Sequence, residues 1–287
     1  MDSSRRIEIS ELAESVAEAH FPTTRIDPYG IARAKQITYS YGRYGRAYDG
    51  LLEHESGAFH IFCNLDRVGD PQSPRARFTI GHELGHFYID EHRTALASGR
   101  SLHHPSRCEY ESNNPVEEEA DCFASNLLMP RKRFEKRARA SALGLAAVLA
   151  LTREFGTSVT SAAIRYAELD VSPCAIIKWD TNGFGWKWIA ASLHRCGFRK
   201  TIEQSAFVVA GSPTARLLSG ELPGVEQFHR AGTLASKWFP YLSGAFRNLV
   251  IIEQAMSLGR FGGLTFLYPD QDDFRQISAK AAFYDSN

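Results

Sequence analysis

Hydrophobic residues recur at helical spacing over several stretches in the first half of the chain. Between residues 7 and 19, Ile, Leu and Val positions are interspersed with glutamates, which predicts an amphipathic helix rather than an export signal. Further helices are expected at residues 28–35 and over residues 75–91, where no proline interrupts the pattern. Three short strands are predicted between these two helices, at residues 36–40, 48–53 and 58–64.

The pattern becomes basic and then helical again after residue 130. Residues 131–139 hold six basic side chains and one acidic side chain. Two helical stretches follow at residues 141–154 and 159–169, and Gly156 suits the end of the first one. This spacing is typical of a helix-turn-helix. Residues 131–166 carry eight basic and two acidic side chains, so DNA contact is one interpretation, although a solvated basic face is favoured.

Residues 170–287 read as a separate α+β unit. Its predicted elements are strands at residues 173–179, 187–191, 206–210 and 264–268 and a helix at residues 244–258. The fold class is therefore α+β, in three parts: a catalytic-type domain at residues 1–130, a basic helical segment at 131–169 and a C-terminal domain at 170–287.

Composition narrows the cellular context. The charges of the 33 basic and 33 acidic residues cancel, so the net charge does not indicate binding to nucleic acid or to a membrane surface. Five cysteines without a C-x-x-C pair indicate reduced thiols rather than a disulfide framework. The longest apolar run, residues 142–151, is shorter than the ~20 residues that a membrane span needs. We therefore expect a cytoplasmic protein.

The predicted helix at residues 75–91 contains the sequence HELGH. Residues i and i+4 of a helix project from one face, so His82 and His86 can share one metal ion, with Glu83 placed to act as general base. Gly81 and Gly85 each cost roughly 1 kcal/mol of helix propensity relative to Ala. They are useful if a neighbouring element or a substrate backbone approaches this helix closely. The alternative is a buried helix with two hydrogen-bonded histidines.

A site of this kind needs a third protein ligand. The spacing of His86 and His92 fits a known three-histidine motif, in which a glycine breaks the helix at the position that Ile89 holds here. If the helix continues instead, His92 lies about 120° off the metal face. His92 is therefore rejected.

Glu117 is the better candidate for the third ligand. Asn114 and the following proline read as the start of a new helix, on which Glu117 and Asp121 share the inward face with Ala124 and Leu128. A carboxylate on a buried face needs a partner, and a metal ion is one. Asp121 could then accept a hydrogen bond from a ligating histidine. The alternative role of Glu117 is a capping box.

Together, RFTIGHELGH and the later E-x-x-A-D-x-F-A-x-x-L-L-M-P resemble the ImmA/IrrE metallopeptidases, over roughly residues 20–170. The resemblance implies a gluzincin-like domain of helices and a short sheet, acting as a zinc-dependent endopeptidase, with Mn²⁺ as the alternative metal. It implies His82, His86 and Glu117 as ligands and Glu83 as the base. Members often cleave a helix-turn-helix repressor, which suggests such a protein as the partner. Some members carry a sensory C-terminal domain; a stabilising domain is the alternative here.

Several features near this motif stay open. His103, His104 and Cys108 could form a second metal site or be solvated residues of a polar loop spanning residues 92–113. The tetrahedral oxyanion needs a donor, for which Tyr88, Tyr110 and the loop histidines are candidates. The edge of the small sheet could hold an extended peptide or be an ordinary covered edge.

Two functions from different classes follow. The first is a zinc endopeptidase that acts on a partner regulator. The second is a DNA- or protein-binding regulator in which the metal site is structural or idle. The intact Glu83 favours the peptidase, because a purely structural site has no need of a general base.

Overall fold

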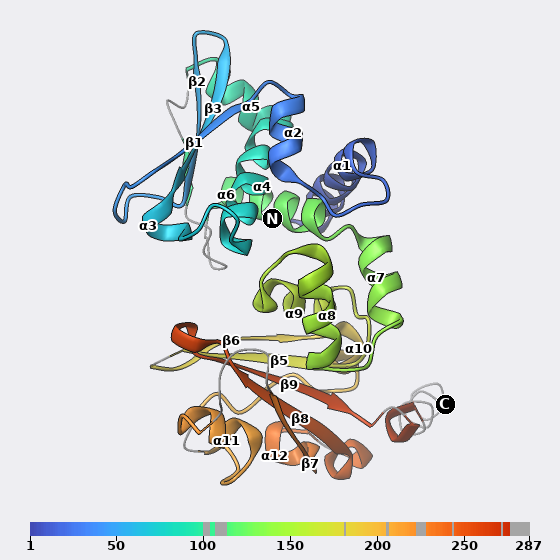
Figure 1. The fold of residues 1–287 in the computed structure, drawn as a ribbon. Helices are drawn as coiled ribbons and strands as arrows, with labels where there is room; N and C mark the ends of the chain where they lie inside the picture. Colours follow the sequence, from blue (N-terminus) through green and yellow to red (C-terminus); the bar gives the residue numbers. More distant parts are fainter. Residues whose placement is uncertain are drawn as a thin grey trace. The chain divides into compact units, whose positions relative to one another are not determined.

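The chain forms two compact units with an α+β architecture, which confirms the predicted fold class (Figure 1). The computed structural model describes residues 1–99, 104–106, 114–180, 182–204, 207–221, 228–242, 244–270 and 272–275. Unit 1 comprises Met1–Phe134 and Leu151–Ser158, and unit 2 comprises Glu135–Ala150 and Val159–Asn287. The division of the chain into three functional parts stays a prediction.

Several helices of unit 1 begin at a side-chain N-cap. Asp2, Asp27, Ser73 and Asn114 each accept a backbone N–H of the first helical turn, and a proline follows three of these caps. The predicted start at Asn114 is thereby confirmed. The helices are α1 Ser3–His20, α2 Pro28–Ala34, α3 Leu65–Val68, α4 Pro74–Tyr88, α5 Asp90–Ala97, α6 Pro115–Leu128 and the beginning of α7 Arg131–Arg139.

The small predicted sheet of unit 1 is present and has a fourth strand. Its order is β1-β3-β2-β4, with β1 parallel to β3 and the other pairs antiparallel. The strands are β1 Thr38–Gly42, β2 Gly50–Glu55, β3 Ala58–Asn64 and β4 His104–Ser106. The unpredicted β4 pairs with residues 50–52 and covers that part of the β2 edge. For these three positions, the covered-edge interpretation is correct.

The helix that carries the HELGH sequence ends earlier than predicted. It stops at Tyr88, and Ile89 takes an extended conformation (φ −74°, ψ 113°) before α5 starts at Asp90. The predicted helix is therefore confirmed for residues 75–88, whereas its continuation through residue 89 is wrong, as is the loop prediction for residues 92–97. A β-branched residue adopts extended backbone readily, and here the Ile89 side chain is buried in the core. Asp90 and Glu91 then favour the N-terminus of α5 electrostatically.

Three candidates from the polar loop cannot be placed. His103, Cys108 and Tyr110 lie outside the described residues, and only the strand backbone of His104 is described. The second metal site and the Tyr110 oxyanion donor therefore stay predictions.

Helix α4 packs against α6 (Figure 1). Gly81 and Gly85 lie at this contact. A Cβ added at Gly85 would lie 3.1 Å from the Cα of Ala120 and 3.2 Å from its carbonyl oxygen. At Gly81 the nearest atom would be the Ala124 Cβ, at an ordinary 3.6 Å. The expected close approach of another element is confirmed, and it is tightest at Gly85.

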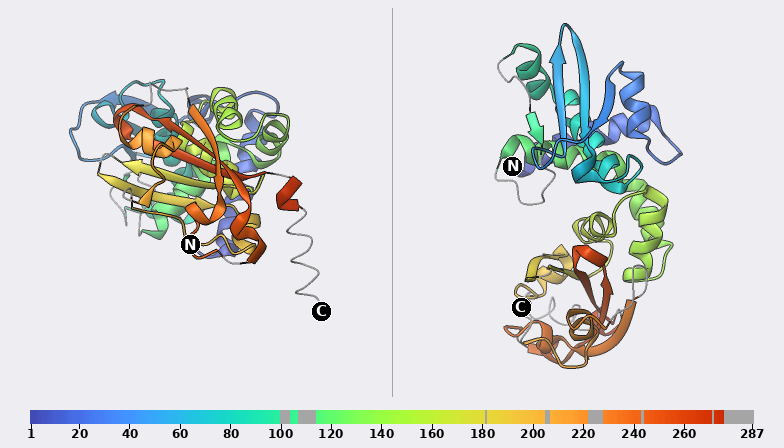
Figure 2. Two further views of the ribbon diagram at one scale, coloured as in Figure 1. Left: turned by 90° about the horizontal axis from the view of Figure 1, so that it is seen from below. Right: turned by 60° about the vertical axis from the view of Figure 1, so that its left-hand side comes forward.

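Unit 2 is built on a five-stranded antiparallel sheet of order β6-β5-β9-β8-β7. In Figure 2 the two yellow strands are β5 and β6, and β5 lies between β6 and the orange-red strand β9. The strands are β5 Ala175–Asp180, β6 Gly183–Ile189, β7 Phe228–Leu234, β8 Val250–Ser257 and β9 Gly263–Pro269. The helices are α8 Leu145–Phe155, which begins in unit 2, then α9 Val159–Glu168, α10 Ala191–Arg195, α11 Pro213–Leu218 and α12 Ala235–Trp238.

Two predictions for unit 2 are wrong. The helix expected at residues 244–258 is a 3₁₀ turn, Gly244–Asn248, followed by β8, and residues 207–210 form no strand. The β-branched run 250–252 favours a strand, but the polar residues Glu253 and Gln254 obscured it. Both are buried, and Glu253 accepts hydrogen bonds from the Trp238 indole and the Thr214 backbone N–H. None of the helices in the described ranges has the length and apolar character to cross a bilayer.

The two motif glycines should respond differently to alanine. Gly81→Ala gains about 1 kcal/mol of helix propensity without a clash. Gly85→Ala gains the same amount but presses on the α6 backbone, and such overpacking costs about 1–3 kcal/mol. Thermal unfolding of the full chain should therefore rank Gly85→Ala below Gly81→Ala. Equal stability of the two variants would show that α6 can retreat without cost.

Candidate metal centre

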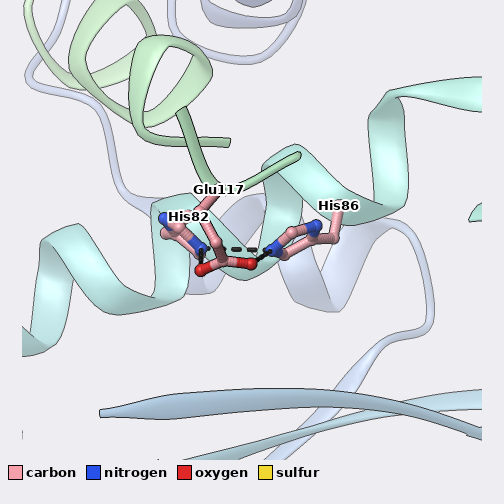
Figure 3. A group of neighbouring side chains, drawn as sticks. All are labelled: His82, His86 and Glu117. Carbon is pink, nitrogen blue, oxygen red and sulfur yellow. Dashed lines mark hydrogen bonds and ion pairs between the residues drawn. The ribbon is translucent and has the colours of Figure 1, made fainter. Parts of the chain in front are cut away.

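Three buried side chains from two helices converge on one point (Figure 3). His82 and His86 lie one turn apart on α4, and their Nε2 atoms are 3.1 Å apart. Glu117 on α6 places its Oε2 3.3 Å from His82 Nε2 and its Oε1 3.4 Å from His86 Nε2. Both histidines are fully buried, and Glu117 is 7% exposed. The structure thus brings together the three predicted ligands.

The donor set fits a zinc-type ion. Two imidazole nitrogens and one carboxylate oxygen, all within 4.8 Å of one another, are the protein ligands typical of a catalytic zinc site with one open position. Imidazole nitrogens suit zinc better than manganese, which prefers oxygen ligands. The ligand roles themselves stay a prediction, which the proposal below develops.

The distal nitrogen of His82 is held by a carboxylate. His82 Nδ1 lies 2.7 Å from Asp121 Oδ1, one turn beyond Glu117 on α6. If the Nδ1–H donates to Asp121, the Nε2 lone pair is directed toward Glu117 and His86. The structure thus shows the predicted contact between Asp121 and a histidine of the pair, whereas the role of Asp121 behind a metal ligand stays a prediction.

His92 lies closer to the site than sequence reasoning allowed. Because the chain turns at Ile89 instead of continuing as a helix, His92 is buried and its Nδ1 lies 3.1 Å from His86 Nδ1. It does not join the three converging groups, since it contacts the opposite ring nitrogen of His86. The rejection of His92 rested on a continuous helix, and that reason was wrong. The spacing of His86 and His92 was the signal that could have found this contact.

The electrostatics of the cluster favour a cation. Burial disfavours the charged form of His82, but hydrogen bonds to Asp121 and Glu117 outweigh it and raise the pKa of His82 well above its ordinary value. Burial lowers the pKa of His86 to about 3, against an opposing hydrogen bond to Glu117. The two carboxylates thus attract positive charge, while His86 is kept as a neutral nitrogen donor, the form that ligates metals.

Glu83 lies under the backbone of β2. It is fully buried, and a Cβ added at Gly50 would come within 2.5 Å of Glu83 Oε1 and of Thr79 Cγ2. Any other residue at position 50 would therefore displace the carboxylate or the strand. Gly50 is a site residue that sequence reasoning missed. A glycine at the start of a strand, where another group must come close, was the available signal.

The neighbouring Asp49 anchors this part of β2. Its fully buried carboxylate accepts hydrogen bonds from Arg67 Nε at 2.6 Å and from an Arg75 terminal nitrogen at 2.7 Å. Burial raises the pKa of Asp49. The two arginines lower it by more than burial raises it, so the net shift of the pKa is downward. The ion pairs tie β2 to α3 and to the first turn of α4, which fixes Gly50 above Glu83.

The predicted oxyanion donor Tyr88 has a different neighbour. Its hydroxyl lies 3.4 Å from His20 Nε2 on α1, and its ring stacks on Phe123. Burial raises the pKa of Tyr88 to about 12, which keeps the hydroxyl protonated. The donor for the oxyanion stays unassigned.

Comparison with known proteins supports the resemblance over the site. Residues 70–166 match the family model for the IrrE N-terminal-like domain, Peptidase M78. A solved Mycobacterium tuberculosis transcriptional regulator has a TM-score of 0.57 to this chain at 14% identity, covering 91% of this chain and 87% of that one. At that identity the likeness concerns the fold alone. A comparison with curated proteins found no match. Residues 70–166 are therefore similar to the IrrE N-terminal-like domain.

Removing Glu117 should empty the site. Glu117→Ala loses one of three candidate protein ligands, so the purified chain should carry little zinc by elemental analysis after dialysis. Glu118→Ala is the matched control, because the Glu118 carboxylate instead binds the N-terminal amine at 2.7 Å. It should retain about one zinc per chain. Full occupancy in Glu117→Ala would transfer the ligand role to another residue, with Asp121 the first to test.

Proposed function

We propose that this protein is a zinc-dependent endopeptidase that cleaves a partner helix-turn-helix repressor. The observation that carries the proposal is the buried group of His82, His86 and Glu117 with Glu83 beside it, inside the segment that matches the IrrE N-terminal-like domain. A purely structural zinc site would need its ligands but no buried carboxylate next to them.

The residues divide the chemistry among them. His82, His86 and Glu117 would hold the ion, which when bound supplies Lewis acidity toward a peptide carbonyl and acidifies water. Glu83 would take the proton of the attacking water and pass it to the leaving amine. Its position beneath Gly50 excludes bulk solvent from one side of the carboxylate. Asp121 would keep His82 in the tautomer that presents Nε2.

The partner class rests on the family resemblance. Members that share the two motifs often act on a helix-turn-helix repressor, and cleavage relieves repression of stress-response, mobile-element or phage genes. The decisive experiment is co-expression with the product of the adjacent gene, followed by mass analysis of the fragments. A defined cut that requires the metal would identify the substrate.

Replacing the base separates chemistry from binding. Glu83→Gln keeps the size of the side chain and removes only its ability to accept a proton, so metal content should stay near native while cleavage of the partner is lost. Elemental analysis and the co-expression assay measure the two effects on the same preparation. Cleavage at a comparable rate in the variant would overturn the assigned role of Glu83.

A second candidate is a DNA- or protein-binding regulator with a structural or idle metal site. Two observations favour it. Helix α7 exposes the basic residues Arg131, Lys132, Lys136, Arg137 and Arg139, and the solved structure with a similar fold is described as a transcriptional regulator. Fold likeness at low identity carries no function, so this candidate stands second.

Salt dependence tests the second candidate. If residues 131–166 bind DNA, affinity for the upstream region of the protein's own gene should fall steeply as salt rises from about 50 to 200 mM, because phosphate contacts release counterions. Reversal of the Arg137 and Arg139 charges should flatten that dependence. No retention of this DNA at low salt would leave the basic face of α7 as a solvated surface.

A further inference from the structure

A chain of polar contacts runs from His86 to the N-terminal helix. His86 Nδ1 lies 3.1 Å from His92 Nδ1, and His92 Nε2 lies 3.2 Å from Glu119 Oε2. Arg5 of α1 then binds Glu119 through two nitrogens, Nε to Oε1 at 3.1 Å and a terminal nitrogen to Oε2 at 2.9 Å. Four side chains from α4, α5, α6 and α1 are thereby connected.

The direction of the hydrogen bonds follows from the metal-facing nitrogen. If His86 presents the Nε2 lone pair to an ion, its ring proton resides on Nδ1 and must be donated. His92 Nδ1 is then the acceptor, so the proton of neutral His92 resides on Nε2 and is donated to Glu119. Each hydrogen bond from His86 to Glu119 then has one donor and one acceptor. The negative charge of the Glu119 carboxylate is balanced by the guanidinium of Arg5, which donates two hydrogen bonds to it.

This arrangement explains how a carboxylate of α6 can serve His86. Residues 117 and 119 are about 200° apart around a helix, so Glu119 points away from the side on which Glu117 meets the histidines. His92 spans that gap, because the turn at Ile89 brings α5 back toward α4. His82 needs no such intermediate, since Asp121 reaches it directly at 2.7 Å.

We propose that His92 is a positioning residue for the metal ligand His86, and that Glu119, clamped by Arg5, holds His92 in the required tautomer. The proposal rests on the metal site of the proposed function. It makes metal affinity depend on the N-terminal helix, which contains no ligand. The partial burial of the pair supports it: the side chains of Glu119 and Arg5 are 16% and 21% exposed, which shields their interaction from solvent.

The test is zinc affinity of the full chain by competition with a chelator. His92→Phe keeps a buried ring but has no acceptor for His86, and loss of such an outer contact typically weakens metal binding about 10–100-fold. His92→Asn retains an oxygen near the Nδ1 position and should lose less than about 10-fold. This recovery in the conservative variant is specific to a positioning role. Thermal unfolding of the zinc-free variants measures any change of stability separately.

Glu91 supplies a matched control. Glu119 and Glu91 both bind Arg5, but Glu119 also lies 3.2 Å from His92 Nε2, whereas the Glu91 side chain is 68% exposed. Glu119→Ala should weaken zinc binding about tenfold, within the range for such outer contacts, whereas Glu91→Ala should leave it unchanged. If His92→Phe does not fold, the Glu119 and Glu91 pair carries the test alone.

The outcomes separate the two proposals. If the native chain takes up no zinc, the metal site and the positioning role fall together. If the native chain binds zinc and His92→Phe or Glu119→Ala binds it equally well, only the positioning role is overturned. A loss of thermal stability in the zinc-free variants with unchanged zinc affinity would likewise assign these residues a structural role.

Discussion

The close contact of α4 with α6 is the constraint on which the candidate site depends. A carboxylate can reach two histidines of a neighbouring helix only if the two backbones approach, and Gly85 permits this by leaving room for the Ala120 backbone at 3.1 Å from a Cβ position. The approach also buries His82, His86 and Glu117 together. Burying ionisable groups is costly unless they are paired or bind a metal. The close approach at Gly85 and the burial of the three side chains therefore both favour metal binding at the contact of α4 with α6.

The surrounding helices and strands orient the side chains of the candidate site. Asp121 contacts Nδ1 of His82, and His92 contacts Nδ1 of His86. Both histidine rings therefore present Nε2 to the same point. The Asp49 ion pairs hold β2 so that Gly50 lies over Glu83. These contacts come from helices and strands far apart in the sequence. Rigid elements of this kind restrict the freedom of the site residues more than loops would.

What could be predicted was local. The helix start at Asn114, the i, i+4 pair on α4 and the inward face of α6 each depend on a few neighbouring residues. The turn at Ile89 could not be predicted in this way, because it depends on burial of that side chain in a core assembled from distant elements. The contact of His92 follows from that turn. Strand β8 was missed for a related reason, since Glu253 and Gln254 look like solvent-facing positions until their buried partners are known.

The two buried glutamates show how geometry distinguishes structure from chemistry. Glu253 is 1% exposed and accepts two N–H donors at 2.8 and 2.9 Å, the distances of ordinary hydrogen bonds. Glu117 is nearly as buried, yet its oxygens lie 3.3 and 3.4 Å from two imidazole nitrogens that also face each other. Donors for Glu253 come from fixed N–H groups, whereas the partners of Glu117 are themselves lone-pair ligands in their neutral form. Three such ligands directed at one point are best stabilised by a shared cation. This difference is the physical basis for proposing a metal site in unit 1 and a purely structural role for Glu253.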